Sequence, residues 1–98
     1  MTDKQFQNAF TTAGGWFIVS QYRFITESRL ETQTLLNRLF NKGFDSDLSG
    51  TKARLGAFNR LIRGNRIQDA MEKIRDSQRI NSQHPEARNM AQEILDSL

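Results

Sequence analysis

The stretch TKARLGAFNRLIRGNR, residues 51–66, contains five basic side chains and no acidic one. Arginine and lysine neutralise phosphates, and asparagine can pair with a base edge, so these residue types suit nucleic-acid binding. A helix over residues 52–63 places its apolar and polar side chains on opposite sides. The basic helix within residues 52–66 is therefore the expected contact surface. Its candidate nucleic-acid-binding residues are Lys52, Gly56, Asn59, Arg60, Arg63 and Arg66.

Two residues of this stretch need separate explanations. Gly56 costs a helix about 1 kcal/mol relative to alanine, so we expect a backbone to come close to it, either a phosphate backbone or a neighbouring helix. Arg54 points toward the apolar side, and we expect it to reach Asp45 or Asp47 in the preceding loop. The alternative for the whole stripe is a solvated face, because every amphipathic helix has a polar side.

The charge of the chain is unevenly distributed. The net charge is +3, and residues 1–49 hold five basic and five acidic side chains, which cancel. Residues 50–98 hold nine basic and six acidic side chains, so the excess lies in the second half. A local basic block favours a polyanionic partner, which is DNA, RNA or another acidic molecule.

The segment RINSQH, residues 79–84, resembles the Arg-x4-His motif of the HEPN ribonucleases. In that family the motif lies at a helix start, and a symmetric dimer pairs two copies to cleave RNA. The resemblance covers six residues and implies catalysis by Arg79 and His84. Ile80 stands where the family has a polar residue. We expect His84 to cap the helix before Pro85 instead.

Other chemistry is excluded by residue counts and spacing. There is no cysteine and a single histidine, which excludes zinc-thiolate sites, thiol catalysis and His-rich metal clusters. DSDLSG, residues 45–50, alternates like a calcium loop, but Gly56 occupies the position where that loop closes on glutamate. No phosphate-cradling glycine loop and no nucleophilic set is present. We therefore predict a non-catalytic protein without metal, cofactor or small-molecule substrate.

The aromatic segment WFIVSQYRFI, residues 16–25, offers a second kind of contact surface. Its β-propensity is high, but no other segment resembles a strand partner, so we predict a central, buried helix and keep a strand as the alternative. Apolar surface left over here would bind protein. The competing function is thus a protein–protein adaptor or inhibitor acting through residues 16–25, alone or as a homodimer.

The elements that position these residues are all predicted to be helices. Apolar periodicity, caps and glycine stops predict an all-α, compact bundle of five to six short helices in a single domain, residues 1–98. We expect a capping box at Ser28 and Glu31, a cap at Thr51 and a cap at Asn65. The expected helices are 3–12, 16–25, one after Ser28 that ends at Gly43, 52–63, 66–78 and one starting at Pro85, with 44–50 a loop and 79–84 a connector.

The last helix is expected to bury Ala87, Met90, Ala91, Ile94, Leu95 and Leu98. The longest apolar run, residues 16–19, is far too short to span a membrane, and the first residues contain no secretion signal. We therefore expect a cytoplasmic protein that does not bind membranes.

Overall fold

The computed structural model describes residues 1–98 and consists of α-helices without strands. This confirms the all-α class, with seven helices where five or six were expected. The helices are α1 (Asp3–Ala13), α2 (Gly15–Thr26), α3 (Thr32–Phe40), α4 (Leu48–Arg63), α5 (Ile67–Asp76), α6 (Gln78–Gln83) and α7 (Ala87–Ser97). None of them combines the length and apolarity needed to cross a bilayer.

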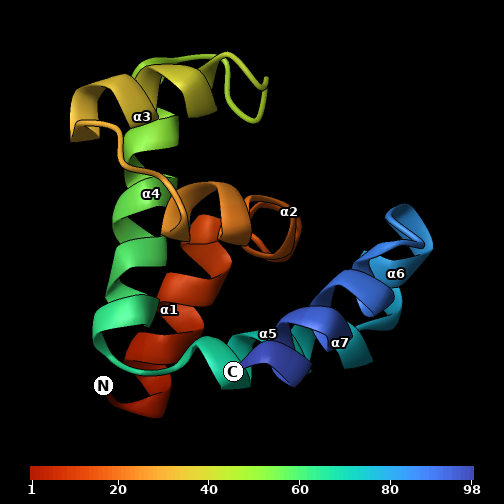
Figure 1. The fold of residues 1–98 in the computed structure, drawn as a ribbon. Coiled ribbons are helices and arrows are strands. Elements are labelled where there is room, and N and C mark those ends of the chain that lie inside the picture. The colour runs from red at the N-terminus through yellow and green to blue at the C-terminus, as the bar shows by residue number, and fades with distance from the viewer.

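The fold is organised around two helix pairs and the helix that connects them (Figure 1). Helices α1 and α4 pack side by side and run in opposite directions, while α5 and α7 form a second pair with α6 at its far end. Helix α2 contacts α1, α5 and α7, and α3 packs on α4. All seven helices contribute to one cluster of 21 buried apolar residues. Hydrophobic burial therefore links both pairs through α2.

Residues 16–25 lie within α2, so the helix prediction is confirmed and the strand alternative is wrong. Phe17, Ile18 and Val19 are buried, which agrees with a central position. Helical geometry satisfies their backbone groups within the segment, whereas a lone strand would leave those groups unpaired.

Three expected helix starts are wrong, and the first of them is that of α7, which begins at Ala87 rather than at Pro85. Helix α3 begins at Thr32, and no capping box forms, because Ser28 Oγ instead accepts the N–H of Leu30 at 3.0 Å within the connector. Helix α4 begins at Leu48 with Asp47 as its cap, so residues 48–50 are helical rather than loop. Asp47 Oδ1 accepts the N–H of Gly50 at 2.8 Å. Thr51 lies buried one turn inside the helix.

The α4–α5 junction also differs from the prediction. Asn65 does not cap α5 but adopts a left-handed conformation, with φ of 57°. The Asn65 N–H donates to Ile62 O and the Arg66 N–H to Leu61 O, which is the Schellman closure of α4. Asparagine is among the few non-glycine residues that tolerate this conformation. Arg66 then stands at the cap position of α5.

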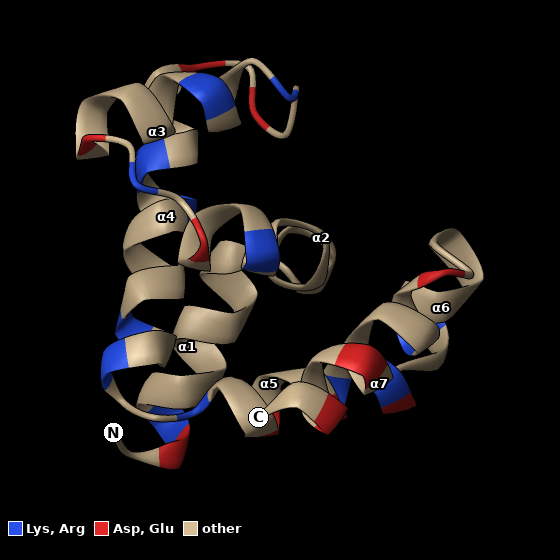
Figure 2. Ribbon diagram, in the orientation of Figure 1, with Lys and Arg blue, Asp and Glu red and all other residues tan.

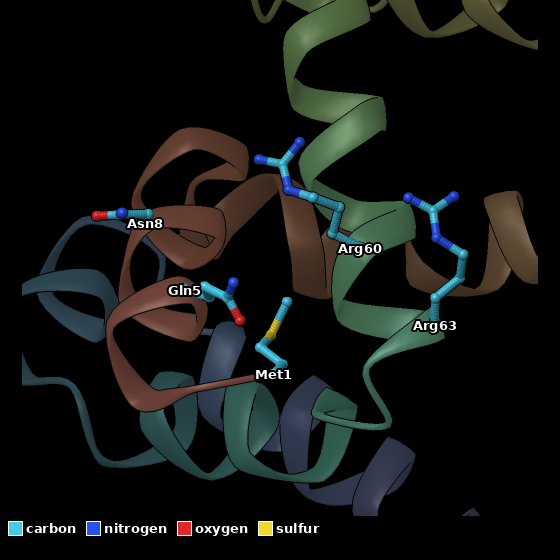
Figure 3. Close-up of a pocket in the computed structure, with 5 residues that line it drawn as sticks. All are labelled: Met1, Gln5, Asn8, Arg60 and Arg63. Carbon is cyan, nitrogen blue, oxygen red and sulfur yellow. The ribbon is translucent and has the colours of Figure 1, made fainter.

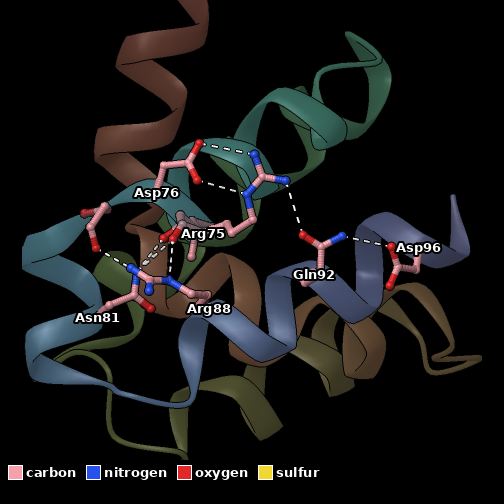
Figure 4. Close-up of polar contacts among 8 residues, drawn as sticks. Arg75, Asp76, Asn81, Arg88, Gln92 and Asp96 are labelled. Atoms are coloured by element: carbon pink, nitrogen blue, oxygen red, sulfur yellow. Dashed lines mark hydrogen bonds and ion pairs between the residues drawn. The ribbon is translucent and has the colours of Figure 1, made fainter.

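The predicted connector 79–84 is wrong, because residues 78–83 form α6. Ser77 Oγ caps this short helix by accepting the N–H of Ile80, and Ile80 is buried. Asn81 Nδ2 donates to the main-chain oxygens of Ile74, Arg75 and Ser77, where α5 ends (Figure 4). The extra helix thus serves as a cap for its neighbour.

The α5–α7 contact is fastened by polar groups as well as by core residues (Figure 4). Arg75 Nε lies 2.9 Å from Asp76 Oδ1, and Arg75 Nη1 donates to Gln92 Oε1 on α7. Arg88 Nε donates to the Arg75 carbonyl. Of the expected inward face of α7, Ala87, Ala91 and Ile94 are buried and Met90 and Leu95 are partly buried. Leu98 is 60% exposed, so its predicted burial is wrong.

Candidate nucleic-acid interface on α4

Helix α4 carries most of the predicted site residues, and its basic positions are marked blue on the ribbon in Figure 2. At 100° per residue, Lys52, Gly56, Asn59, Arg60 and Arg63 fall within an arc of about 100°. The Lys52, Arg60 and Arg63 side chains are exposed, and none takes part in an ion pair of the structure. Three cations of this face are therefore available to a partner.

Arg60 and Arg63 line a pocket between α1 and α4 (Figure 3). Its volume is about 420 Å³, and its other lining residues are Met1, Gln5 and Asn8. This volume falls within the range of about 300–1,000 Å³ typical of ligand sites. The lining contains two guanidinium groups and no carboxylate, so the pocket attracts anions.

The carboxamides that α1 contributes were missed by the sequence analysis. Gln5 Oε1 accepts the N–H of Thr2 at 2.9 Å in the α1 capping box, which leaves its Nε2 donors free. The Asn8 amide forms no hydrogen bond within the protein. Both residues are polar and three apart, which places them on one side of α1. The helical repeat of α1 places these two residues on one side, but nothing in the sequence pairs that side with α4.

Gly56 is open to solvent and not packed against a neighbouring helix. A Cβ added at this position would have no atom within 4 Å. A close helix contact is therefore not the reason for a glycine here. The bare backbone leaves space on the outer face, one helical turn from both Lys52 and Arg60.

Arg66 is engaged within the protein. Its guanidinium donates to Asp69 and lies 3.2 Å from Asp3 Oδ1, and it also covers the Phe6 ring at 4.4 Å. The hydrogen bond to Asp69 is the main reason why the pKa of Arg66 is raised further above its usual value. The structure thus places Arg66 beside the α4 face, but its donors already have partners.

Arg54 contacts a loop carboxylate, as predicted. Its Nε lies 3.0 Å from Asp45 Oδ2, and its Nη1 donates to Ala13 O at 2.8 Å. The Thr51 hydroxyl donates to the same Asp45 carboxylate. Arg54 therefore joins the loop before α4 to the end of α1, and it fixes the pair of helices that carries the pocket.

Arg79 and His84 lie together in the lining of another pocket, of about 370 Å³. The His84 ring stacks on Trp16 with centroids 4.0 Å apart and an interplanar angle of 2°. The His84 main-chain N–H donates to Ile80 O, so the residue closes α6 directly before Pro85. One face of the imidazole is covered by this stack.

The aromatic segment contributes mainly to the core. Trp16, Tyr22, Phe24 and Ile25 are partly buried and pack against the core cluster. The large apolar side chains that are exposed lie elsewhere: Met1, Leu30, Leu48, Ile62 and Leu98. The exposed large apolar side chains therefore come from outside residues 16–25, which mainly pack against the core.

No group of three or more histidine, aspartate or glutamate side chains is placed to hold a metal ion. Comparison with protein-family models, with curated proteins and with solved structures finds no match for this chain.

Proposed function

We propose that this protein is a non-catalytic binding module that contacts nucleic acid through the outer face of α4. The observation that carries the proposal is that the guanidinium groups of Arg60 and Arg63, neither of which forms an ion pair, line a pocket without a carboxylate. Arginine binds phosphate oxygens in a bidentate geometry and also stacks on bases.

Three further observations support this partner class. Lys52 extends the cationic surface along the helix, and the open position at Gly56 lets a sugar–phosphate backbone approach. The Asn8 amide and the free Nε2 donors of Gln5 offer hydrogen bonds suited to base edges. A solvated face would not by itself place cations and free amide groups together in one pocket.

The test is a binding titration of the full chain with 5′-hydroxyl oligonucleotides: single-stranded RNA, single-stranded DNA and duplex DNA. Affinity is measured at several salt concentrations between about 50 and 200 mM, where counterion release makes log K fall linearly with log salt. The double variant Arg60→Gln with Arg63→Gln should bind more weakly. Its salt slope should be flatter by about 1.4 to 1.8, because each phosphate contact contributes about 0.7 to 0.9.

A matched control removes two exposed arginines from the α5–α7 side, Arg79→Gln with Arg88→Gln. Because Arg88 donates to the Arg75 carbonyl, circular dichroism checks that this variant remains folded. This variant carries the same net charge as the α4 variant, so a general charge effect would weaken both equally. The proposal expects the control to retain the wild-type slope. Equal slopes in the two double variants, or no binding of any oligonucleotide at the lowest salt concentration, would show that the stripe is only a solvated face.

A further inference from the structure

A second group of arginines, from residues that precede α4 in the chain, lines a different pocket. Arg23 lies in the last turn of α2, Arg29 in the connector after α2, and Arg38 in the last turn of α3. All three line one pocket of about 280 Å³, together with Glu27 and Ser28. Three separate segments of the backbone therefore bring guanidinium groups to a single place.

None of these three arginines is neutralised by the protein. Glu27 lies in the same lining and Glu93 beside Arg23 in an adjacent pocket, yet neither forms an ion pair with an arginine. Three guanidinium groups against one carboxylate leave two positive charges in excess in the pocket. Arginine cannot lose its proton in a protein, so this excess persists at any physiological pH.

Further groups strengthen the positive field of the pocket. The ring of Phe24 is part of the lining, and the Lys42 ammonium lies 4.0 Å above the centroid of that ring. Ser28 Oγ accepts the Leu30 N–H, which leaves the Ser28 hydroxyl hydrogen free to donate. The pocket thus offers cations and a neutral donor.

Helix dipoles explain only part of this arrangement. A cation in the last turn of a helix is stabilised, which accounts for Arg23 and Arg38 taken singly. Arg29 lies in no helix, so no dipole explains its position. Bringing three like charges to one pocket is unfavourable by itself, and a bound anion would remove this repulsion.

We propose that the pocket formed by Arg23, Arg29 and Arg38 binds the dianionic group of a phosphomonoester. Such a group carries about −1.5 to −2 charges at pH 7 and three acceptor oxygens, which match the excess charge and the guanidinium donors. A diester carries a single charge and leaves the pocket half neutralised. The volume of the pocket suits one such group rather than a whole nucleotide. This site does not depend on the α4 face.

The experiment is an NMR titration of the isotopically labelled full chain with two probes, glycerol phosphate as the monoester and dimethyl phosphate as the diester. We expect shifts in the amides of residues 23–38, and an affinity about tenfold higher for the monoester. Arg29→Gln should abolish that preference without unfolding the chain, because Arg29 is exposed and outside the helices. Lys4→Gln, an exposed cation on α1, is the control and should change nothing.

Glu27→Gln provides a test in the opposite direction. Removing the only carboxylate of the pocket should tighten monoester binding by about fivefold, the equivalent of about 1 kcal/mol. Equal affinity for both probes, or equal weakening by Lys4→Gln and Arg29→Gln, would overturn the proposal.

Two sources of the monoester are distinguished by oligonucleotides with a 5′-phosphate or a 5′-hydroxyl. Tighter binding of the phosphorylated strand, lost in Arg29→Gln, identifies a strand end and supports the site. Equal binding of both strands together with retained glycerol phosphate binding identifies a free phosphomonoester, and also supports it.

Discussion

Replacing Arg54 by alanine tests the link between the loop before α4 and the end of α1. The side chain of Arg54 contacts both oxygens of Asp45, at 3.0 and 3.1 Å, and donates to Ala13 O at 2.8 Å. The two side chains are 27% and 16% exposed, so water screens the pair only partly. A hydrogen bond to a charged group contributes about 1.5–3 kcal/mol. Alanine leaves space in which water can hydrate the Asp45 carboxylate and the Ala13 carbonyl. We therefore expect the free energy of unfolding to fall by about 2–3 kcal/mol rather than by the sum of all contacts.

The assay is urea unfolding followed by circular dichroism, together with a thermal melt. For a domain of this size the loss corresponds to a melting temperature lower by roughly 8 to 24 °C. Arg54→Lys keeps the charge but not the fork geometry, so its loss should be intermediate. Arg60→Ala is the matched control on the same helix, and should change stability by no more than about 0.5 kcal/mol. If Arg54→Ala costs no more than this control, the contact does not hold the helices together.

Four further predictions concern stability. Gly14 has φ of +85°, and a Cβ there would lie 2.7 Å from Arg54 Nη1, so Gly14→Ala should destabilise the protein by more than about 1 kcal/mol. Gly56→Ala should instead stabilise it by about 0.5–1 kcal/mol, because the added Cβ meets open space. The urea midpoint should therefore fall for Gly14→Ala and rise for Gly56→Ala. Leu39 is fully buried, so Leu39→Ala should cost about 2–4 kcal/mol, and a loss below about 0.5 kcal/mol in urea unfolding would contradict the packing of α3. Hydrogen bonds from the Gly50 N–H and then the Ser49 hydroxyl lower the pKa of Asp47 below 3.8, so its contribution is present above this value and is lost as the pH falls through the lowered pKa. Asp47→Asn keeps the cap acceptor, and acid titrations of stability should show a weaker pH dependence for this variant than for the wild type.

Local sequence signals predicted the helices with strong apolar periodicity, and failed where several polar residues competed for a cap. Asp47 and Thr51 both precede the apolar face of α4 and are both good caps. Asp47 caps the helix because Asp45 accepts the Thr51 hydroxyl, a contact that also recruits Arg54. Helix α6 was missed because its hexapeptide has no periodicity. Its place depends on the burial of Ile80, which is a tertiary effect.

The candidate site was predictable to the extent that it lies on one helix. The exposure of Lys52, Arg60 and Arg63 follows from the 3.6-residue repeat of α4. The pocket needs Asn8 from α1, and only the packing of α1 against α4 brings that residue close. The ion pairs of Arg66 with an aspartate far away in the chain depend on the same packing.

The two helix pairs differ in how much chain must be closed to form them, and this sets an order of folding events. The Arg88–Arg75 contact closes 13 residues, whereas the Arg54–Ala13 contact closes 41. Loop-closure entropy favours the shorter loop by about 1 kcal/mol, so the pairing of α5 with α7 should precede that of α1 with α4 along the folding route. We therefore predict that the Arg54 contact forms late, after the rate-limiting barrier. In a chevron plot, Arg54→Ala should raise the unfolding rate and leave the refolding rate unchanged.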